Sequence, residues 1–408
     1  MAELKTCPVS GVAEVDFNSE DFLLNYKETY RSIHQSGCPF AHSTDGDFYG
    51  LAAHKDIVEA CLKPKQWSSK FGPGLQYQPP ETPGVLVTVD PPEHTFEARL
   101  VGKAFSKAYF ESFIPGIRAF LNERIDSFIA SGRCDIHKEI SEPLPLWVIF
   151  TMFGKHIDQE GIASFRAGFL AGIGQMLQRQ APAVRPNTAT HFLADHLEDM
   201  KRKLKTGEAQ PEDNLLTKFI TAEIDGRRLT DEKILGFCSF LLTAGSGTTT
   251  IMLSNLLYRL LEDRSRFERV AANRELIPVA IEECLRLDAP VQGLFRTNNE
   301  ATEVGPLQME ADTKVMMLWA AGNLDPTVFK DPHKYDLDRD MGELRKHLAF
   351  GFGIHICRGA PLSRIEGQLF LEAIFDRLPN IQLDGPPRPE LRVPVLQGIR
   401  ELPVTWNV

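Results

Sequence analysis

Residues 350–359 read Phe350-Gly351-Phe352-Gly353-Ile354-His355-Ile356-Cys357-Arg358-Gly359 and place one cysteine in a glycine-rich turn. Glycine has no Cβ, so such a turn folds tightly and approaches a flat ligand closely. The residues that follow, Ala360, Pro361 and a periodic apolar run, predict a helix that begins just after Cys357. The free N–H groups and the dipole of a helix N-terminus stabilise a thiolate. We therefore expect the pKa of the Cys357 thiol to be lowered and the thiolate to bind a metal.

This stretch strongly resembles the haem-binding loop of the cytochrome P450 family, Phe-Gly-x-Gly-x-His-x-Cys-x-Gly. The resemblance implies a haem-thiolate monooxygenase in which Cys357 is the metal ligand of haem b, with Phe350 and Gly351 beside the cofactor. A thiolate ligand donates electron density and favours cleavage of an O–O bond in a haem. A lone cysteine in a turn is more often buried and inert, but the flanking pattern is too specific for that interpretation.

The composition excludes several classes of protein. The chain has 408 residues, 43% of them hydrophobic, which is enough for a large core. A net charge of −10 without a basic stripe argues against nucleic acid or an anionic membrane as partner. Seven cysteines without paired spacing fit a reducing compartment. No apolar leader follows Met1, and the apolar run 235–242 is too short to span a bilayer, so we expect a monomeric cytoplasmic protein.

Helical periodicity dominates the chain. It predicts helices near 21–36, 93–106, 113–131, 159–177, 189–205, 213–224, 231–262, 266–273, 275–287 and 360–377. Strand-like segments are short and few: 47–51, 314–318 and 401–405. The expected fold is therefore mainly α with a minor β portion, in one domain over residues 1–408. It agrees with the single-domain helical fold of the cytochrome P450 family, although residues 1–84 match that family more loosely.

The longest predicted helix carries a weak point in its middle. Thr230 is a suitable N-cap, and apolar residues cover nearly all faces of 234–261, so this helix should be buried. Its centre holds Gly245 and Gly247, and each interior glycine destabilises a helix by about 0.8–1 kcal/mol relative to alanine. Either a neighbouring element packs closely against a glycine, or the helix forms a groove there for a small ligand beside the metal.

The segment 244–249 resembles the family's distal haem motif, in which Ala244, Gly245, Thr248 and Thr249 match. The resemblance implies a catalytic role for Thr248 in proton delivery to oxygen, with Ala244 and Gly245 beside it. Gly247 stands where the family usually has an acid, so that acid is absent here. Without it, water or another residue must supply the protons.

Other motifs match the family in the expected order. Glu283 and Arg286 lie three residues apart, which alone would be an ordinary surface ion pair. The resemblance implies instead a structural pair behind the haem, with Arg339 as its third member. It also implies that His94, Arg296 and His355 bind the two haem propionates. The family's additional arginine is Ala98 here, and we do not transfer its role to Arg99, which would point about 100° further round the helix.

The chain has no flavin or iron–sulfur motif, so its electrons must come from a separate protein. We expect a ferredoxin or a flavodoxin, with its reductase, to dock on a basic patch near the cysteine loop, unless these cations are only scattered solvated charges. The cations concerned are Arg99, Lys103, Arg345, Lys346 and Arg358.

The predicted substrate positions are all apolar, and each could equally be ordinary core: Leu86, Leu241, Ala244, Val291, Leu294 and Leu396. They imply a small or medium apolar substrate such as a terpenoid, an alkylated aromatic or a steroid. The segments 71–84 and 182–186, rich in glycine or proline, are predicted covers of the pocket. The missing acid leaves open peroxide-driven, isomerase or dehydratase chemistry, and a non-catalytic haem sensor is a further alternative; the presence of Thr248 favours the monooxygenase.

Overall fold

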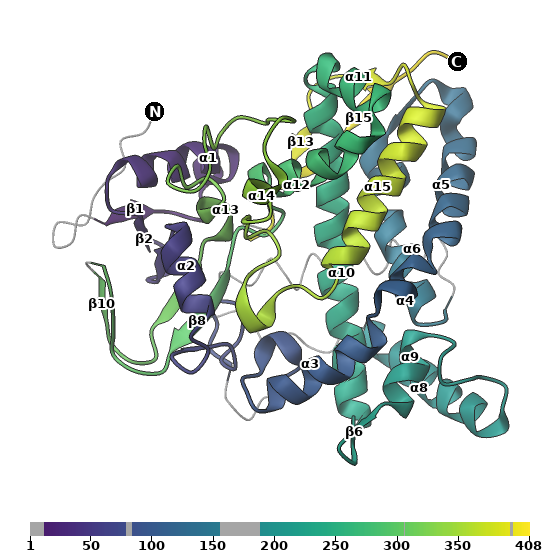
Figure 1. Cartoon of the computed structure of the whole chain (residues 1–408), viewed down its shortest axis with the longest axis horizontal. Helices are drawn as coiled ribbons and strands as arrows, with labels where there is room; N and C mark the ends of the chain where they lie inside the picture. Colours follow the sequence, from purple (N-terminus) through teal and green to yellow (C-terminus); the bar gives the residue numbers. More distant parts are fainter. Residues whose placement is uncertain (1–11, 79–83, 156–187, 306, 392–394) are drawn as a thin grey trace.

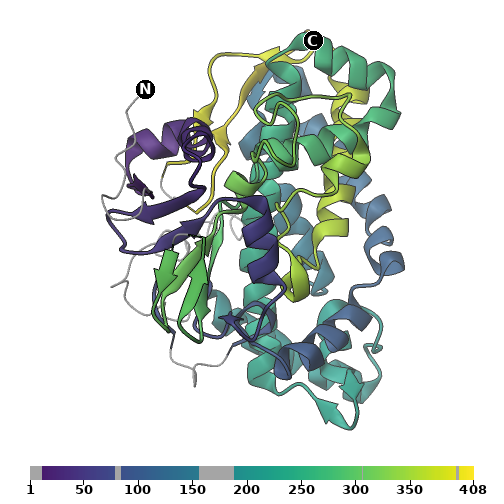
Figure 2. The same cartoon turned by 60° about the vertical axis from the view of Figure 1, so that its left-hand side comes forward.

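Helices make up most of the molecule and gather on one side of it, whereas most strands lie on the other side (Figures 1 and 2). The computed structural model describes residues 12–78, 84–155, 188–305, 307–391 and 395–408. The expectation of a mainly α fold with a minor β portion is confirmed. The helix predicted near 159–177 and the cover predicted near 182–186 lie outside the described residues.

The helices follow the predicted periodicity closely in most places. Their bounds are α1 (Glu20–Gln35), α2 (His54–Cys61), α3 (Glu93–Ala104), α4 (Lys107–Glu111), α5 (Ile114–Phe128), α6 (Pro143–Met152), α8 (Thr188–Thr206), α9 (Leu215–Thr221), α10 (Asp231–Leu261), α11 (Arg264–Ala272), α12 (Ile277–Leu287), α13 (Trp319–Gly322), α14 (Met341–Leu344) and α15 (Ala360–Arg377). Among these, α2, α4, α6, α13 and α14 were not predicted. The sequence of α6 is almost wholly apolar and so has no amphipathic period, and its two prolines fall in the first turn, where no N–H is needed.

The largest sheet has six strands in the order β1-β2-β3-β11-β8-β4. They are β1 (Ala13–Val15), β2 (Phe40–Ser43), β3 (Tyr49–Leu51), β11 (Lys314–Met317), β8 (Leu294–Asn298) and β4 (Trp67–Ser68). Three smaller pairings are hairpin-like: β9 (Thr302–Val304) with β10 (Leu307–Met309), β6 (Glu223–Ile224) with β7 (Arg227–Arg228), and β13 (Arg388–Pro389) with β14 (Ile399–Glu401). A three-stranded sheet joins β12 (Gln382–Leu383), β15 (Pro403–Thr405) and β5 (Arg133–Asp135).

The strand predicted over 401–405 is wrong as a single element. It divides into β14 and β15, which pair with different partners. The division falls at Leu402, whose N–H donates to the carboxylate of Asp135 (2.9 Å) and whose carbonyl accepts from Ile136 (3.1 Å). The next residue, Pro403, has no N–H with which to continue a ladder, so the backbone changes sheets there.

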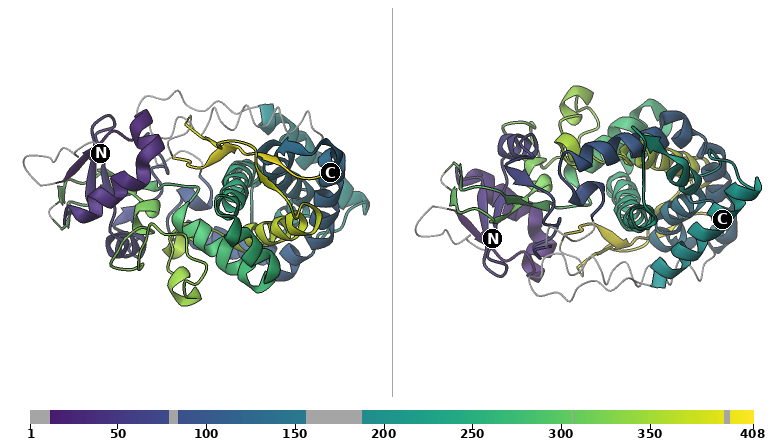
Figure 3. Two further views of the ribbon diagram at one scale, coloured as in Figure 1. Left: turned by 90° about the horizontal axis from the view of Figure 1, so that it is seen from above. Right: turned by 90° about the horizontal axis from the view of Figure 1, so that it is seen from below.

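The helix α10 is the centre of the helical half of the molecule. The Thr230 hydroxyl accepts from Lys233 N, as an N-cap should, and the helix then runs unbroken to Leu261. Figure 3 shows it nearly end-on among other helices, and α6, α8, α11, α12 and α15 pack against it. Within the described residues it is the one helix whose length and mean hydropathy would suit a membrane crossing, but its C-terminal half is buried in this packing.

Glu283, Arg286 and Arg339 form a buried network, not a surface ion pair. Both guanidinium groups reach the same carboxylate: Arg286 at 2.7 Å and 2.8 Å, Arg339 at 3.1 Å and 3.3 Å. The side chains of Glu283 and Arg286 are 0% exposed. Arg286 also donates to three backbone carbonyls, those of Asn323, Pro332 and Lys334. Glu283 therefore pairs with both cations, Arg339 has Glu343 as a second partner, and together these contacts fasten α12 to the long segment leading toward Cys357.

We predict that Glu283→Gln lowers the free energy of unfolding by about 3–5 kcal/mol, because it removes the carboxylate partner of the buried Arg286 and leaves Arg339 with Glu343 alone. Urea denaturation followed by circular dichroism measures the change. Glu59→Gln is the matched control. Glu59 is an exposed partner of Lys63, so its substitution should cause no measurable change in the free energy of unfolding. A Glu283→Gln protein as stable as the control would show that the network is not essential.

Candidate functional site

The loop that carries Cys357 is held tightly against the protein. Gly351 and Gly353 have φ of +69° and +73°, which favours glycine at both positions. A Cβ on Gly353 would lie 2.4 Å from the carbonyl oxygen of Cys61, so a side chain there is excluded on a second ground. The Cys357 N–H donates to the Phe350 carbonyl (2.9 Å), which closes the turn. Cys357 is exposed, whereas Gly351 and Ala360 on either side are buried.

The expected lowering of the thiol pKa is wrong for the protein alone. Desolvation by the protein packed around the loop raises the pKa of Cys357. The N–H groups of Gly359 and Ala360 act in the predicted direction and lower it, as do the guanidinium groups of Arg364 and Arg358, but their sum is smaller. A metal cation beside the sulfur would supply the missing positive charge, since a coordinating thiol is deprotonated.

Three predicted propionate residues come together in the structure. The rings of His94 on α3 and His355 meet edge to face, with centroids 4.4 Å apart. His94 Nε2 and His355 Nδ1 are buried without a hydrogen-bond partner among the described residues. Desolvation lowers the pKa of both rings, and the Arg296 guanidinium lowers that of His355 further, to about 3. The two imidazoles are therefore neutral, and each has a nitrogen free to pair with a ligand.

Arg296 on β8 is 4% exposed and donates to the Phe295 carbonyl (2.9 Å). No carboxylate in the described part of the chain forms an ion pair with it. A buried guanidinium beside two unpaired imidazole nitrogens is unfavourable unless an anion completes it. The two carboxylates of a haem have the charge and the acceptor atoms that this cluster lacks, so these residues fit the cofactor.

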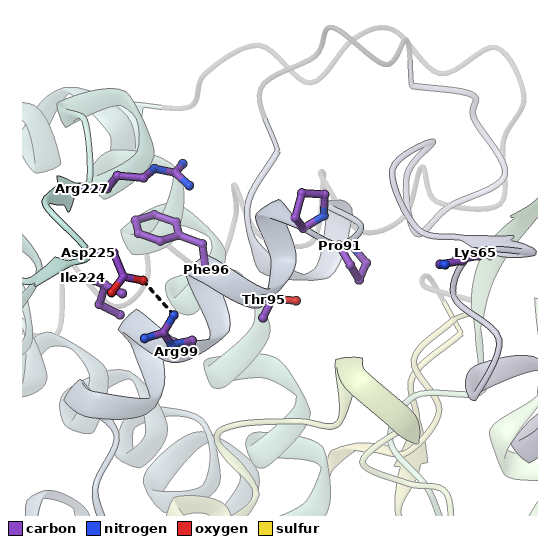
Figure 4. Close-up of a pocket in the computed structure, with 9 residues that line it drawn as sticks. Lys65, Pro91, Thr95, Phe96, Arg99, Ile224, Asp225 and Arg227 are labelled. Atoms are coloured by element: carbon purple, nitrogen blue, oxygen red, sulfur yellow. Dashed lines mark hydrogen bonds and ion pairs between the residues drawn. The ribbon is translucent and has the colours of Figure 1, made fainter.

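Arg99 does not belong to this cluster. Its guanidinium pairs with Asp225 (3.0 Å) in the turn between β6 and β7, as Figure 4 shows. Phe96 lies on the same helix, beneath the Arg227 guanidinium at 4.0 Å. These residues line a surface pocket at the outer side of α3. The position that matches the family's arginine is Ala98, so the propionates depend on the cluster formed by His94, Arg296 and His355.

The middle of α10 presents one face that the protein leaves uncovered. Thr243 and Ala244 are exposed and Thr248 is half-buried, although the C-terminal half of the helix is buried. Gly245 lies on another side, where a Cβ would come within 2.6 Å of the Ile149 side chain, so close packing against α6 accounts for this glycine. The Thr248 hydroxyl donates to the Ala244 carbonyl (2.9 Å), which leaves its lone pairs free to accept a hydrogen bond.

The predicted substrate residues lie on several elements. Val291 and Leu396 meet in an isolated β-bridge, which joins the chain after α12 to the C-terminal segment. Leu294 opens β8, and Leu241 lies one turn before Ala244 on α10. Leu241, Val291 and Leu294 are only partly buried, whereas Leu396 is buried.

Leu86 is fixed by a pair of residues that sequence reasoning missed. Its N–H donates to the Glu97 carboxylate (2.5 Å), and Lys233 Nζ donates both to that carboxylate and to the Gly84 carbonyl (2.6 Å each). Glu97 is fully buried. This ion pair ties the Leu86 segment to α3 and α10.

Glu366 on α15 is a second residue that the sequence reasoning missed. It is 3% exposed, and its Oε2 has no hydrogen-bond partner among the described residues. Desolvation raises the pKa of this carboxyl well above its ordinary value, which favours its protonated form. The next residue, Gly367, lies against Met252, one turn beyond Thr248 on α10. The signal in the sequence was an acid on the otherwise apolar stripe of α15.

A further cluster, formed by Glu282, His347 and Arg364, contacts the start of the cysteine loop at Phe350. Glu282, beside Glu283 on α12, accepts from His347 (2.9 Å) and from Arg364 (2.5 Å and 2.8 Å). The Arg364 guanidinium lies 4.6 Å from the centre of the Phe350 ring, a cation–π distance. Burial alone would raise the pKa of Glu282, but hydrogen bonds from Arg364 and His347 outweigh it and lower the pKa to about 2.

An exposed cysteine before a helix, a buried arginine beside two neutral histidines and an uncovered helix face with a threonine together suit an anionic cofactor that carries a metal. The sequence profile described as Cytochrome P450 matches residues 49–395. Cyclomarin C epoxidase CymV of Salinispora arenicola is 33% identical over 361 residues, 88% of this chain and 90% of the relative. The Steroid C26-monooxygenase of Mycolicibacterium smegmatis is 29% identical over 371 residues, 88% of this chain and 89% of the relative.

The solved structures agree. Cytochrome P450 CYP109Q5 from Chondromyces apiculatus has a TM-score of 0.83 and 26% identity, covering 97% of this chain and 98% of that one. CYP109E1 from Bacillus megaterium, solved with testosterone, has a TM-score of 0.78 and 29% identity, covering 94% and 100%. The chain belongs to the cytochrome P450 family. It is a cytochrome P450 monooxygenase, an oxidoreductase whose cofactor is haem.

We predict that Glu282→Gln makes the free energy of unfolding less dependent on pH in the acid range. A carboxyl with a folded pKa of about 2 stabilises the fold above its ordinary value of 4.5, and the stabilisation is lost as pH falls from 4.5 toward 2. Between pH 5 and pH 3 the wild type should lose about 2 kcal/mol more than the variant, measured by urea denaturation at both pH values. Equal losses would mean that Glu282 titrates normally.

Proposed function

We propose that the protein inserts one oxygen atom from O2 into a C–H bond of a small or medium apolar molecule, and that it receives electrons from a separate redox protein in the cytoplasm. The observation that carries this proposal is the cysteine loop together with Thr248 on the uncovered face of α10. A non-catalytic sensor would need the first feature but not the second.

Haem b fits the cluster described above, and when bound it supplies the redox-active iron at which O2 is activated. Cys357 would hold the iron, while His94, Arg296 and His355 would bind the propionates. Phe350 would cover the sulfur side, held by Arg364. Gly351 keeps a side chain away from that side of the loop, where Trp319 lies 3.5 Å from the place of a Cβ. The hydrogen bonds around Glu283 and Glu282 would keep the cysteine loop in a fixed position during electron transfer.

Thr248 would act as an acceptor that positions a proton-bearing group. Its own proton is held by the Ala244 carbonyl, so its oxygen can accept a hydrogen bond from a water molecule. Gly247 offers no acid beside it. We propose that Glu366 supplies the proton instead, because it is buried, desolvation raises its pKa, and it lies on a helix that packs against α10 near Met252. Water would complete the path between the two residues.

The electron donor that we propose is a ferredoxin or a flavodoxin with its reductase. Arg345, Lys346 and Arg358 are exposed and flank the cysteine loop, which supports an acidic partner. Arg99 contributes less than expected because Asp225 neutralises it, and the side chain of Lys103 lies outside the described residues.

For the substrate we propose a rigid apolar molecule such as a steroid. A terpenoid and an alkylated aromatic are the alternatives. The apolar residues named above support it, as do the relatives: three are called Steroid C26-monooxygenase, and the CYP109E1 structure contains testosterone. Hydroxylation would then occur at whichever carbon Leu86, Val291 and Leu396 hold beside Ala244. Nothing in this arrangement requires a second subunit, and we propose a monomer.

We predict that the reduced carbon monoxide complex has the strongly red-shifted Soret band of thiolate ligation, and that Cys357→Ala abolishes it. Cys38 is a free, partly exposed cysteine that lies far from Cys357 in the sequence. The control variant Cys38→Ala should therefore keep the band. Testosterone is the first substrate to test, by product analysis against consumption of reducing equivalents. Hydrogen peroxide as the sole major product would contradict the monooxygenase proposal.

We predict that Glu366→Gln lowers the yield of product per reducing equivalent at least about fivefold without changing the Soret band, because an amide of the same size cannot give up a proton. Gly247→Asp in that background should restore part of the yield. Glu372→Gln on the same helix is the control, since Glu372 pairs with Arg118 near the surface. A yield unchanged by Glu366→Gln would assign proton delivery to water alone.

A further inference from the structure

A lysine on β11 is enclosed by carbonyl groups and has no acid to pair with. Lys314 Nζ donates to the carbonyls of Phe71 (2.7 Å), Gly72 (3.0 Å) and Gly74 (3.1 Å). It forms no ion pair with any carboxylate of the described residues. Three carbonyls from one short stretch converge on one ammonium group, so the lysine holds a loop and does not neutralise a charge.

The loop held in this way is residues 71–78, which we call the glycine loop. Phe71, Gly72, Gly74 and Leu75 are buried, so the loop is part of the interior. Gly72 has a φ of +93°, and the Gln78 N–H returns to the Phe71 carbonyl (3.0 Å), which closes the turn. The rings of Phe71 and Tyr77 stack with centroids 4.9 Å apart.

The glycine loop connects the residues that face the haem edge. The Phe295 N–H, between Leu294 and Arg296 on β8, donates to the Pro73 carbonyl (2.9 Å). At the root of the loop the Gly72 N–H donates to the Ser69 carbonyl (3.1 Å), and the Ser69 hydroxyl lies 3.0 Å from His355 Nε2. A shift of the loop would therefore move both the Arg296 strand and the His355 ring.

The surroundings of Lys314 disfavour its charged form, so the hydrogen bonds that it donates must offset this unfavourable burial. Thr297 pairs with Lys314 across the sheet, next to Arg296. Desolvation first, and then the Arg296 guanidinium, lower the pKa of Lys314 to about 7. An apolar side chain of the same length would avoid this penalty, so its substitution should leave the protein folded.

We propose that Lys314 is a positioning residue that fixes the glycine loop against β8 and thereby sets how readily a ligand passes between the Leu294 strand and the haem. The second half of this statement rests on the proposed function. The chemistry is a clamp of three hydrogen bonds from a single cation to backbone carbonyls, and no proton or electron is transferred.

The test compares Lys314→Met with the wild-type holoenzyme free of substrate. The variant removes all three donors and the charge, so the amides of Gly72, Gln78 and Phe295 should exchange hydrogen about tenfold faster or more. Amides in the C-terminal half of α10 should not change. Lys107→Met, on a lysine whose side chain is 87% exposed, is the control and should leave all three amides unchanged. Unchanged exchange in a folded Lys314→Met protein would overturn the clamp.

If Lys314→Met fails to retain haem, Lys314→Gln replaces it, because an amide keeps two donors without the charge and should give an intermediate exchange rate. Wild-type exchange in Lys314→Gln would equally overturn the clamp. Lys314→Arg retains the charge and the donors, so exchange closer to wild type than in the glutamine variant is expected.

Ligand passage is measured by stopped-flow binding of 4-phenylimidazole, an apolar ligand of haem iron. Association and dissociation rates should both rise about threefold or more in Lys314→Met, with a smaller change in the dissociation constant. Faster amide exchange with unchanged binding rates would overturn the role in ligand passage. Because 4-phenylimidazole binds without oxygenation, a wild type that binds it but forms no oxygenated product would contradict the proposed function and leave the Lys314 result intact.

Discussion

The carboxylate of Glu283 is the interaction on which the order of the cysteine loop depends. It pairs with Arg286 and Arg339, and these arginines donate hydrogen bonds to carbonyls of the segment 323–334. Asn323, whose carbonyl binds Arg286, accepts through its side chain from the Leu348 N–H (2.5 Å), two residues before Phe350. A chain of buried polar contacts thus runs from α12 to the turn that holds Cys357. The Asn323 Nδ2 group has no hydrogen-bond partner among the described residues, but the charged groups of the network are all paired, and removing one of them would leave another unpaired.

The haem edge shows the opposite condition, because its polar groups are not satisfied by the protein. Among the described residues the buried Arg296 forms no ion pair with a carboxylate, and His94 and His355 each keep a nitrogen without a hydrogen-bond partner. Lys314 adds another cation nearby and turns to backbone carbonyls. Buried polar groups are normally paired, so this concentration of unpaired donors describes a binding site for a dianion. An anionic cofactor would bind favourably here because it would supply the charge and the hydrogen-bond partners that these groups lack.

The central helix combines two requirements that conflict in most helices. Gly245 lets α6 approach, while Thr243, Ala244 and Thr248 leave another part of the helix surface open. The hydroxyls of Thr243, Ser246 and Thr248 donate to carbonyls one turn earlier, and such bonds slightly destabilise a helix, in a segment that already has low helix propensity. The uncovered surface and the weak part of the helix therefore coincide.

The motifs around Cys357, Thr248 and Glu283 could be read in the sequence because each depends on residues close together in the chain. The helices with a clear amphipathic period were predicted for the same reason. By contrast, α6 was not predicted because an all-apolar helix has no period, and the strand at 401–405 was misjudged because its partners lie far away at Asp135 and Arg388. The sign of the Cys357 pKa shift also failed, because desolvation depends on what packs around the loop.

By itself the sequence determined the class of the protein: a cysteine turn before a helix, a weakened central helix and their order along the chain. Only the tertiary structure decided which polar groups remain unpaired. Whether Arg296, His355, Glu366 or Lys314 has a partner depends on atoms contributed by distant elements, and no local pattern records them. The physical reason is that burial and hydrogen bonding are properties of the surroundings, which the chain acquires only when it folds.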